Sequence, residues 1–364
     1  MKDLNWIEKI RLRNKQRELS DRCVKVNRTD KIHLEVLRVC PTYYCNRNCS
    51  FCYSDGLQNE FKTPMSIEDF EFLCDWAKKQ GYRSLRLLGG EPTVHPKFGA
   101  LLDIAKRYRF TVSLSTNGFF DSKISSLFKK GFIESINFSY PQDEINPQDL
   151  ELFSKNIQET IYKKIPVVIS GVVYPDRDDW RKVLELAIKL HRRSITRFSM
   201  VLPGHGRHFS IEEFRDYLKD LAYQMMELSR YAYKNYVVFY FYRPIIPCIF
   251  KPEEIKFLTS ISKNLFDTFC SCSCIDGNML TVNPDLSCFP CPSLSIKGIK
   301  ITHQISKEAI HQYFRENLTN FSQQPLMDEC RTCQYFINYQ NYLKNKKRLF
   351  SGLLCHGGCY QYRY

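Results

Sequence analysis

The sequence lacks the long apolar runs of a membrane protein. No stretch of the 364 residues approaches the ~20 apolar residues that a membrane-spanning helix requires. Residues 1–17 are charged throughout, so they do not resemble the apolar segment of an export signal. We therefore expect a cytoplasmic protein with no membrane partner.

A concentrated block of one charge is also missing. The 53 Lys and Arg residues outnumber the 39 Asp and Glu residues and give a formal net charge of +14, but they are spread along the chain. A nucleic-acid-binding domain typically gathers its basic residues on one face or one helix. We therefore expect a solvated basic surface and no nucleic-acid partner. A basic, zinc-stapled nucleic-acid-binding protein is kept as the non-enzyme alternative.

Cysteine, by contrast, is abundant. The chain has 16 cysteines, and those from Cys248 onward crowd its last third. In a long chain without an export signal, cysteines in such numbers are better explained as metal ligands in a reducing compartment than as disulfides.

The most specific pattern is a loop of three cysteines. Cys45, Cys49 and Cys52 follow an apolar strand-like run in a C-x3-C-x2-C spacing. Iron–sulfur clusters of four irons usually take four thiolates, so three would leave one iron open to another ligand. Zinc is the alternative, but a structural zinc site takes four protein ligands, and the nearest spare thiol, Cys40, would have to fold back.

This loop and the later run Gly89-Gly90-Glu91-Pro92 resemble the motifs of the radical S-adenosylmethionine (radical SAM) enzymes. The resemblance implies that S-adenosylmethionine (SAM) chelates the open iron of a 4Fe-4S cluster. It also implies that Phe51 packs near the adenine, and that the glycine turn, with Glu91, meets the methionine amino group. Glycines at 89 and 90 would let the backbone approach a ligand closely.

Alternating apolar and amphipathic segments from residue 32 onward predict a parallel α/β fold. We expect strands at 34–39, 84–88, 110–115, 133–139, 166–173 and 194–201. We expect helices at 66–80, starting at Ser66 and stopping at Gly81, and at 95–107, 148–162 and 180–191. Six such units match the partial (β/α)6 TIM-type barrel that the resemblance implies. The motifs follow strand ends, where these folds place their sites.

We expect four segments along the chain. They are a basic N-terminal extension (1–30), the radical SAM barrel core (31–205), a helical and aromatic bridging region (206–265) and a small cysteine-rich domain (266–364). Trp6, Ile7 and Ile10 predict a short helix packed on the barrel. The aromatic run 236–242 is better explained by core packing than by stacking on bases.

Three further positions are less specific. Ser139, at the end of the fourth strand, resembles a ribose-contacting position of the family, although Tyr140-Pro141 replaces the usual Asp-Gly. A plain strand-end serine is the alternative. Asn117 is expected to form a turn rather than to bind a ligand. The resemblance places the backbone of residues 202–204 near the adenine.

The C-terminal cysteines resemble the auxiliary-cluster (SPASM) domain of peptide-modifying radical SAM enzymes. Residues 274–291 predict a β-hairpin with ligands at both ends, and the pairs at 330–333 and 355–359 resemble the second half of that domain. The chain departs from the family pattern at three points. Leu286 stands where glycine is usual, 21 residues separate Cys333 from Cys355, and the family's final cysteine has no counterpart before Tyr364.

The resemblance implies one or two auxiliary 4Fe-4S clusters. The first would use Cys274, Cys291 and Cys359, with Cys270 or Cys272 as the fourth ligand. The second would use Cys330, Cys333 and Cys355, and it needs a substitute such as Cys288 or leaves an iron open. Zinc held by the last four cysteines is the alternative. The predicted metal ligands are Cys45, Cys49, Cys52, Cys270, Cys272, Cys274, Cys288, Cys291, Cys330, Cys333, Cys355 and Cys359.

The activity implied is that of an oxidoreductase that cleaves SAM reductively and removes hydrogen from its substrate through the resulting 5′-deoxyadenosyl radical. The expected substrate is a ribosomally made peptide or a protein side chain, with an acidic leader and with crosslinking or oxidation as the outcome. Flavodoxin or ferredoxin would donate electrons. Oxidation or decarboxylation of a small molecule or tetrapyrrole is the alternative. No spacing identifies a catalytic acid, base or radical-quenching residue.

Overall fold

The computed structural model describes residues 4–28, 36–52, 54, 56–143, 145–200, 211–241, 246–261, 279–290, 298–323 and 328–345. The chain divides into two compact units. One comprises Met1–Thr29, Ser170–Cys272 and Thr319–Tyr364, and the other comprises Asp30–Ile169 and Ser273–Leu318. We call them the outer-segment unit and the central unit. No helix among the described residues has the length and apolar character needed to cross a membrane.

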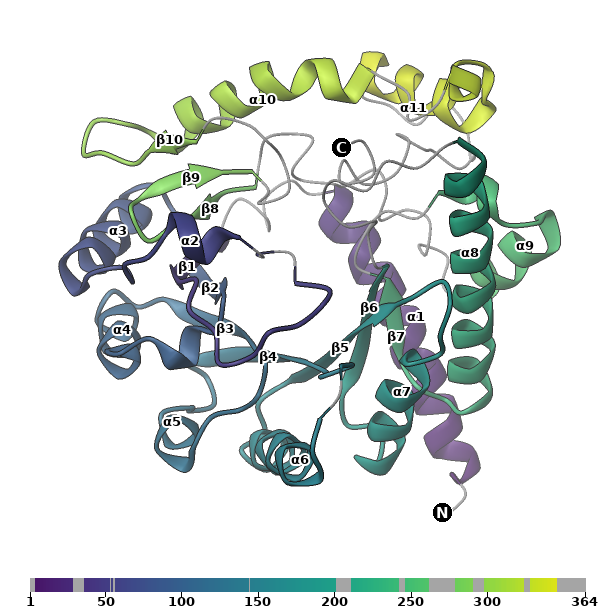
Figure 1. The fold of residues 1–364 in the computed structure, drawn as a ribbon, viewed down its shortest axis with the longest axis horizontal. Helices are drawn as coiled ribbons and strands as arrows, with labels where there is room; N and C mark the ends of the chain where they lie inside the picture. The colour runs from purple at the N-terminus through teal and green to yellow at the C-terminus, as the bar shows by residue number, and fades with distance from the viewer. Residues whose placement is uncertain are drawn as a thin grey trace. The chain divides into compact units, whose positions relative to one another are not determined.

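The central unit is built on four parallel strands that lie side by side (Figure 1). They are β1 (Val36–Thr42), β2 (Ser84–Gly89), β3 (Thr111–Thr116) and β4 (Ile133–Ser139). Their register places Val39, Leu87, Leu114 and Ile136 in one row, and each is at most 2% exposed. Buried rows of this kind explain why the strands are nearly continuous apolar runs. The predicted α/β class with a mostly parallel sheet is confirmed.

Helices follow the strands of this unit and lie along one side of them (Figure 1). They are α3 (Ile67–Lys79), α4 (Phe98–Arg107), α5 (Ser122–Ser126) and α6 (Pro147–Tyr162), with the short α2 (Leu57–Glu60) and η2 (Pro92–Val94) before and after β2. Ser66 caps α3 by accepting a hydrogen bond from the backbone N–H of Asp69, as expected. Gly81, at φ +82°, follows the end of that helix.

A small hairpin extends the sheet of the central unit beyond β1. Strand β8 (Thr281–Val282) pairs parallel to β1, β9 (Ser287–Phe289) returns antiparallel to β8, and β10 (Ile299–Lys300) pairs with β9. The predicted hairpin is therefore present. Leu286, at its turn, has φ +68°, a left-handed conformation that favours glycine. The Tyr43 hydroxyl donates to Asn283 Oδ1 at 2.8 Å and fastens the hairpin to the end of β1. Helix α10 (Lys307–Gln323) follows.

The outer-segment unit holds β6 (Ile195–Met200) and β7 (Phe239–Phe241), which pair in parallel. The unit division falls within β5 (Val167–Val173). Its described helical elements are α1 (Trp6–Arg28), α7 (Trp180–Lys189), α8 (Ile211–Lys234), η3 (Pro247–Ile249), α9 (Pro252–Ile261), η5 (Asp328–Thr332) and α11 (Gln334–Asn345). Phe239 and Phe241 are buried, so the aromatic run serves core packing, as predicted.

The N-terminal helix is longer than expected and packs through different residues. Gln16 is buried, and its amide exchanges two hydrogen bonds of 2.8 and 2.9 Å with the backbone of Phe239. The guanidinium of Arg13 lies 4.2 Å from the centre of the Tyr233 ring. Trp6 and Ile7 instead remain 74% and 63% exposed. The helix is thus fixed by a polar anchor near its middle, which apolar patterning does not reveal.

Candidate cofactor site

The three loop cysteines lie directly beyond the carboxyl end of β1. The backbone N–H of Cys52 donates to the carbonyl of Cys49 at 3.1 Å, which turns the loop back on itself. Burial is the largest cause that raises the pKa of the Cys49 thiol to about 11, and repulsion by Asp143, Cys45 and Cys52 adds to it. One short, turned loop thus carries all three cysteines. Cys45 and Cys52 are also exposed and open to a ligand.

The two glycines of the predicted motif pack against the start of the cysteine loop. The N–H groups of Gly90 and Glu91 donate to the carbonyls of Thr42 and Tyr44 at 3.0 and 2.8 Å. A Cβ on Gly90 would lie 2.4 Å from the carbonyl oxygens of Tyr43 and Tyr44. Glycine is required there because neighbouring backbone already fills the space. The turn thus positions the base of the loop, a role that the sequence does not disclose.

Glu91 braces the ends of β2 and β3. Its side chain is fully buried; Oε1 accepts from the N–H and hydroxyl of Thr93 at 3.1 and 2.6 Å and from the Thr116 hydroxyl at 2.8 Å. Oε2 accepts from the Asn117 N–H at 2.6 Å. Burial is the largest cause raising the pKa of this carboxyl, and the four hydrogen bonds oppose it. Because an oxygen of a carboxylate has about two acceptor positions, Oε2 keeps capacity for a further donor such as an ammonium group.

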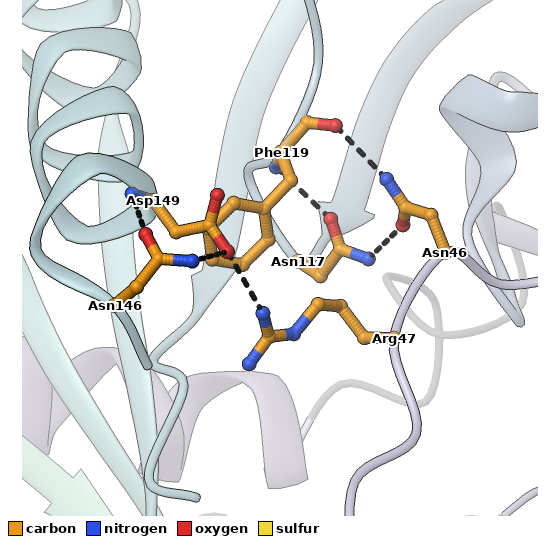
Figure 2. A network of polar contacts seen from close by, with 6 residues as sticks. All are labelled: Asn46, Arg47, Asn117, Phe119, Asn146 and Asp149. Carbon is orange, nitrogen blue, oxygen red and sulfur yellow. Dashed lines mark hydrogen bonds and ion pairs between the residues drawn. The ribbon is translucent and has the colours of Figure 1, made fainter. Parts of the chain in front are cut away.

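An amide pair connects the turn after β3 to the cysteine loop (Figure 2). Asn117 Nδ2 donates to Asn46 Oδ1 at 2.6 Å and lies 3.6 Å from Cys45 Sγ. Asn117 Oδ1 accepts from the N–H of Phe119 at 3.0 Å, and Asn46 Nδ2 donates to the carbonyl of Phe119 at 3.1 Å. Asn117 therefore organises a turn, as expected, and it also orients the residue that follows the first cysteine.

Two acidic side chains beyond β4 hold the remainder of the loop. Arg47 pairs with Asp149 at the start of α6, with Nη1 and Oδ2 3.3 Å apart, and its guanidinium lies 4.8 Å from the centre of the Phe119 ring (Figure 2). Asp143 accepts from the N–H and hydroxyl of Ser50 at 2.9 and 2.8 Å. Residues between the cysteines are thus tied to the carboxyl-end regions of β3 and β4. Sequence reasoning missed these anchors, because the only signal in the sequence is that these side chains are polar.

The chemistry of the loop suits a thiolate-bound cluster. Burial is the largest cause raising the pKa of the Cys45 thiol; repulsion by Glu91 and Cys52 adds to it, while hydrogen bonds from the Arg47 backbone and Asn117 oppose it. Thiols with raised pKa values hold their protons until a metal displaces them. Cys45, Cys49 and Cys52 can supply three thiolates to a cluster.

The other predicted cofactor residues are placed near this loop or remain outside the described chain. Phe51 lies in the loop and is half-buried, and Ser139 is the half-buried last residue of β4. Tyr140 next to it is buried, with its ring centre 5.8 Å from that of Phe153. The predicted contact of residues 202–204 lies outside the described residues.

Three of the predicted C-terminal ligands lie in the described chain. Cys288, on β9, is fully buried and its thiol donates to the carbonyl of Ile299 at 2.9 Å. Cys330 and Cys333 are half-buried, and the N–H of Cys333 donates to the carbonyl of Cys330 at 3.0 Å. Within the described ranges, no three His, Cys, Asp or Glu side chains converge on the position of one metal ion. The remaining predicted ligands lie outside the described residues: Cys270, Cys272, Cys274, Cys291, Cys355 and Cys359.

The structure thus combines a mostly parallel α/β sheet with a loop of three cysteines beyond the end of a strand. Residues 39–221, half of the chain, match the family model of the radical SAM superfamily. The chain belongs to the radical SAM superfamily. Membership implies SAM and a 4Fe-4S cluster as cofactors, and it removes the support for the nucleic-acid-binding alternative.

Curated relatives of this chain include proteins named probable GTP 3′,8-cyclase. The one from Thermococcus kodakarensis is 27% identical over 152 residues, which cover 39% of this chain and 49% of the relative. The one from Saccharolobus solfataricus is 25% identical over 225 residues, which cover 56% and 71%. The chain therefore spans about half the length of the first relative.

Solved structures share the fold over most of the chain. SuiB of Streptococcus suis bound to S-adenosylmethionine superposes with a TM-score of 0.60 at 14% identity, covering 89% of this chain and 78% of SuiB. The anSMEcpe structure with bound AdoMet and the Kp18Cys peptide gives a TM-score of 0.61 at 16% identity, covering 90% and 89%. At these identities the likeness concerns the fold.

Proposed function

We propose that Cys45, Cys49 and Cys52 hold a 4Fe-4S cluster with which this chain removes hydrogen from a peptide or protein side chain, leading to a crosslink or an oxidation. The loop itself carries the proposal, because three neighbouring thiols lie beyond a strand end and the residues between them are anchored. After reduction by a donor such as flavodoxin or ferredoxin, the cluster would cleave bound SAM to supply a 5′-deoxyadenosyl radical.

The chain's own residues would bind and orient the cofactors. The hydrogen bonds of Asn46, Arg47 and Ser50 hold the loop in one conformation, so little ordering remains when the cluster binds. Oε2 of Glu91 accepts one hydrogen bond and can accept a second, which would suit the methionine ammonium once the fully buried carboxyl is opened to the cofactor. Phe51 would pack near the adenine, and Ser139 would contact the ribose.

Two features support a peptide or protein substrate. The likeness to SuiB and anSMEcpe extends over about nine tenths of the chain, and structures of both proteins with bound peptides have been solved. The ten cysteines from Cys248 onward suit one or two auxiliary 4Fe-4S clusters, for which the proposed ligands include the six outside the described residues. The net charge of +14 suits an acidic leader.

A nucleotide is the second candidate substrate. The relatives named probable GTP 3′,8-cyclase support it, since the Saccharolobus protein aligns with 225 residues. That match nevertheless covers only 56% of this chain. The small-molecule hypothesis thus takes the specific form of a purine nucleotide.

The test uses the full chain, reconstituted anaerobically and reduced with dithionite. Formation of 5′-deoxyadenosine should occur in the wild-type protein and be lost in the Cys45→Ala/Cys49→Ala/Cys52→Ala triple variant; retained cleavage would refute the assignment of the loop. GTP and a synthetic peptide encoded beside the gene are then supplied separately. Substrate-dependent stimulation by the peptide supports the peptide hypothesis, and stimulation by GTP replaces it with the nucleotide one.

A further inference from the structure

Two segments that are distant in sequence, one with Cys248 and the other with Cys330 and Cys333, pack together within the outer-segment unit. Cys248 lies in η3, while Cys330 is in η5 and Cys333 directly precedes α11. Ile246, two residues before Cys248, is buried against Leu218 of α8. Ile249, immediately after Cys248, and Tyr335, two residues after Cys333, pack on the same cluster. Shared packing therefore brings the two cysteine segments to one place on α8.

A charged contact fixes the same arrangement. Arg215 of α8 forms an ion pair with Glu329, the residue before Cys330. Cys248 is exposed to solvent, and Cys330 and Cys333 are half-buried. The segments that carry the three cysteines thus lie together on α8, and their thiols are not sealed in the core.

We infer that Cys248 joins Cys330 and Cys333 as a ligand of an auxiliary iron–sulfur cluster in this unit. The inference rests on the proposed function and deepens it, since the sequence alone leaves the second auxiliary cluster without a fourth thiolate. The sequence prediction offered Cys288 as a substitute. Cys248 fits better, because Cys288 is fully buried and its thiol already donates to the carbonyl of Ile299.

In the part of the chain that the structure describes, no three His, Cys, Asp or Glu side chains converge on one ion, so a cluster fits these cysteines better than a single ion. A zinc ion holds each sulfur at about 2.3 Å, so its ligands crowd around one point. In an iron–sulfur cluster each thiolate binds a different iron, and the sulfurs stand further apart. The repulsion that disfavours neighbouring thiolates in the free protein is relieved when iron compensates their charge. Binding would also join η3 to the start of α11 and stabilise both segments.

Iron counting provides the main test. In the Cys45→Ala/Cys49→Ala/Cys52→Ala background, only auxiliary iron remains. Adding Cys248→Ala should lower iron and sulfide by about four per chain, or convert the cluster to a three-iron form with its own paramagnetic resonance signal. Adding Cys288→Ala, the rival ligand, should change neither. Unchanged iron and an unchanged signal in the Cys248→Ala protein would overturn the inference, as would zinc in place of iron at this site.

A second measurement needs no variant. Iodoacetamide should modify Cys248 in the apo wild-type protein at least about tenfold faster than in the reconstituted one, because a ligated thiolate is not free to react. The buried thiols of Cys74 and Cys288 are slow controls in both states. Equal modification of Cys248 in both states, with Cys330 and Cys333 protected, contradicts the inference. A failure of the proposed function gives a different result: the Cys45→Ala/Cys49→Ala/Cys52→Ala variant would then hold as much iron as the wild type.

Discussion

Gly90→Ala is expected to destabilise the protein even in the absence of every cofactor. The added Cβ would lie 2.4 Å from the carbonyl oxygens of Tyr43 and Tyr44, which are backbone atoms and cannot rotate away. Residues 42–44 would have to move away from the end of β2. This movement would break the hydrogen bonds that the N–H groups of Gly90 and Glu91 donate to Thr42 and Tyr44. The cysteine loop begins at the next residue and would lose its position.

The size of the effect follows from these contacts. Two backbone hydrogen bonds contribute about 0.5–1.5 kcal/mol each, and relieving an overpacked contact costs about 1–3 kcal/mol. The free energy of unfolding should therefore fall by about 2–6 kcal/mol, a large share of the 5–15 kcal/mol typical of folded proteins. With a denaturant slope of about 3 kcal/mol per molar, the urea midpoint falls by roughly 0.7–2 M.

Two other glycines serve as controls in the same urea titration. Gly99→Ala, within α4, places its Cβ 3.7 Å from Leu127 Cδ1 at the end of α5, which is an ordinary contact, and should stabilise the protein by up to about 1 kcal/mol. Gly131 has φ +88° and open space around it. Gly131→Ala should therefore lower the free energy of unfolding only by the strain of a left-handed alanine, about 1–2 kcal/mol. An apo Gly90→Ala protein with wild-type stability that fails only to bind SAM would refute the reasoning, because Gly90 would then face the ligand.

Three further outcomes are expected. Asp143→Ala removes both hydrogen bonds to Ser50. The loop should lose about 1–2 kcal/mol of stability after allowance for solvent, so trypsin should cleave the apo protein after Arg47 roughly tenfold faster. An unchanged cleavage rate would show that Asp143 does not anchor the loop. Glu91→Gln places an NH2 group against an N–H or hydroxyl donor in a fully buried site. The free energy of unfolding should therefore fall by about 1–3 kcal/mol. A stability equal to that of the wild type would contradict the role of Glu91 in joining the ends of β2 and β3. The pKa of Cys49 is about 11, so its alkylation rate, followed by peptide mass spectrometry, should rise about tenfold per pH unit from pH 7 to 9 as the thiolate fraction grows. A plateau within that range would show that the thiol titrates lower.

The fold was largely predictable because its signals are local. Alternation of strand and helix patterns located β1 to β4 and the helices α3, α4 and α6, and Ser66 marked the start of α3. The pattern could not show that α1 is anchored through Gln16, because a single polar residue carries no periodicity. The five-residue α5 and the short strands β8 to β10 depend on pairing and packing partners far along the chain.

The sequence by itself determined the chemistry: the spacing of Cys45, Cys49 and Cys52, and the glycine turn with its glutamate, identify the radical SAM superfamily. Local spacing suffices there because one short loop carries all three thiols. The tertiary structure alone decided which groups surround that chemistry. Asp143 reaches Ser50, and the segment of Cys248 packs on the same cluster as the start of α11, because strand ends and packed helices bring together segments that no sequence period relates.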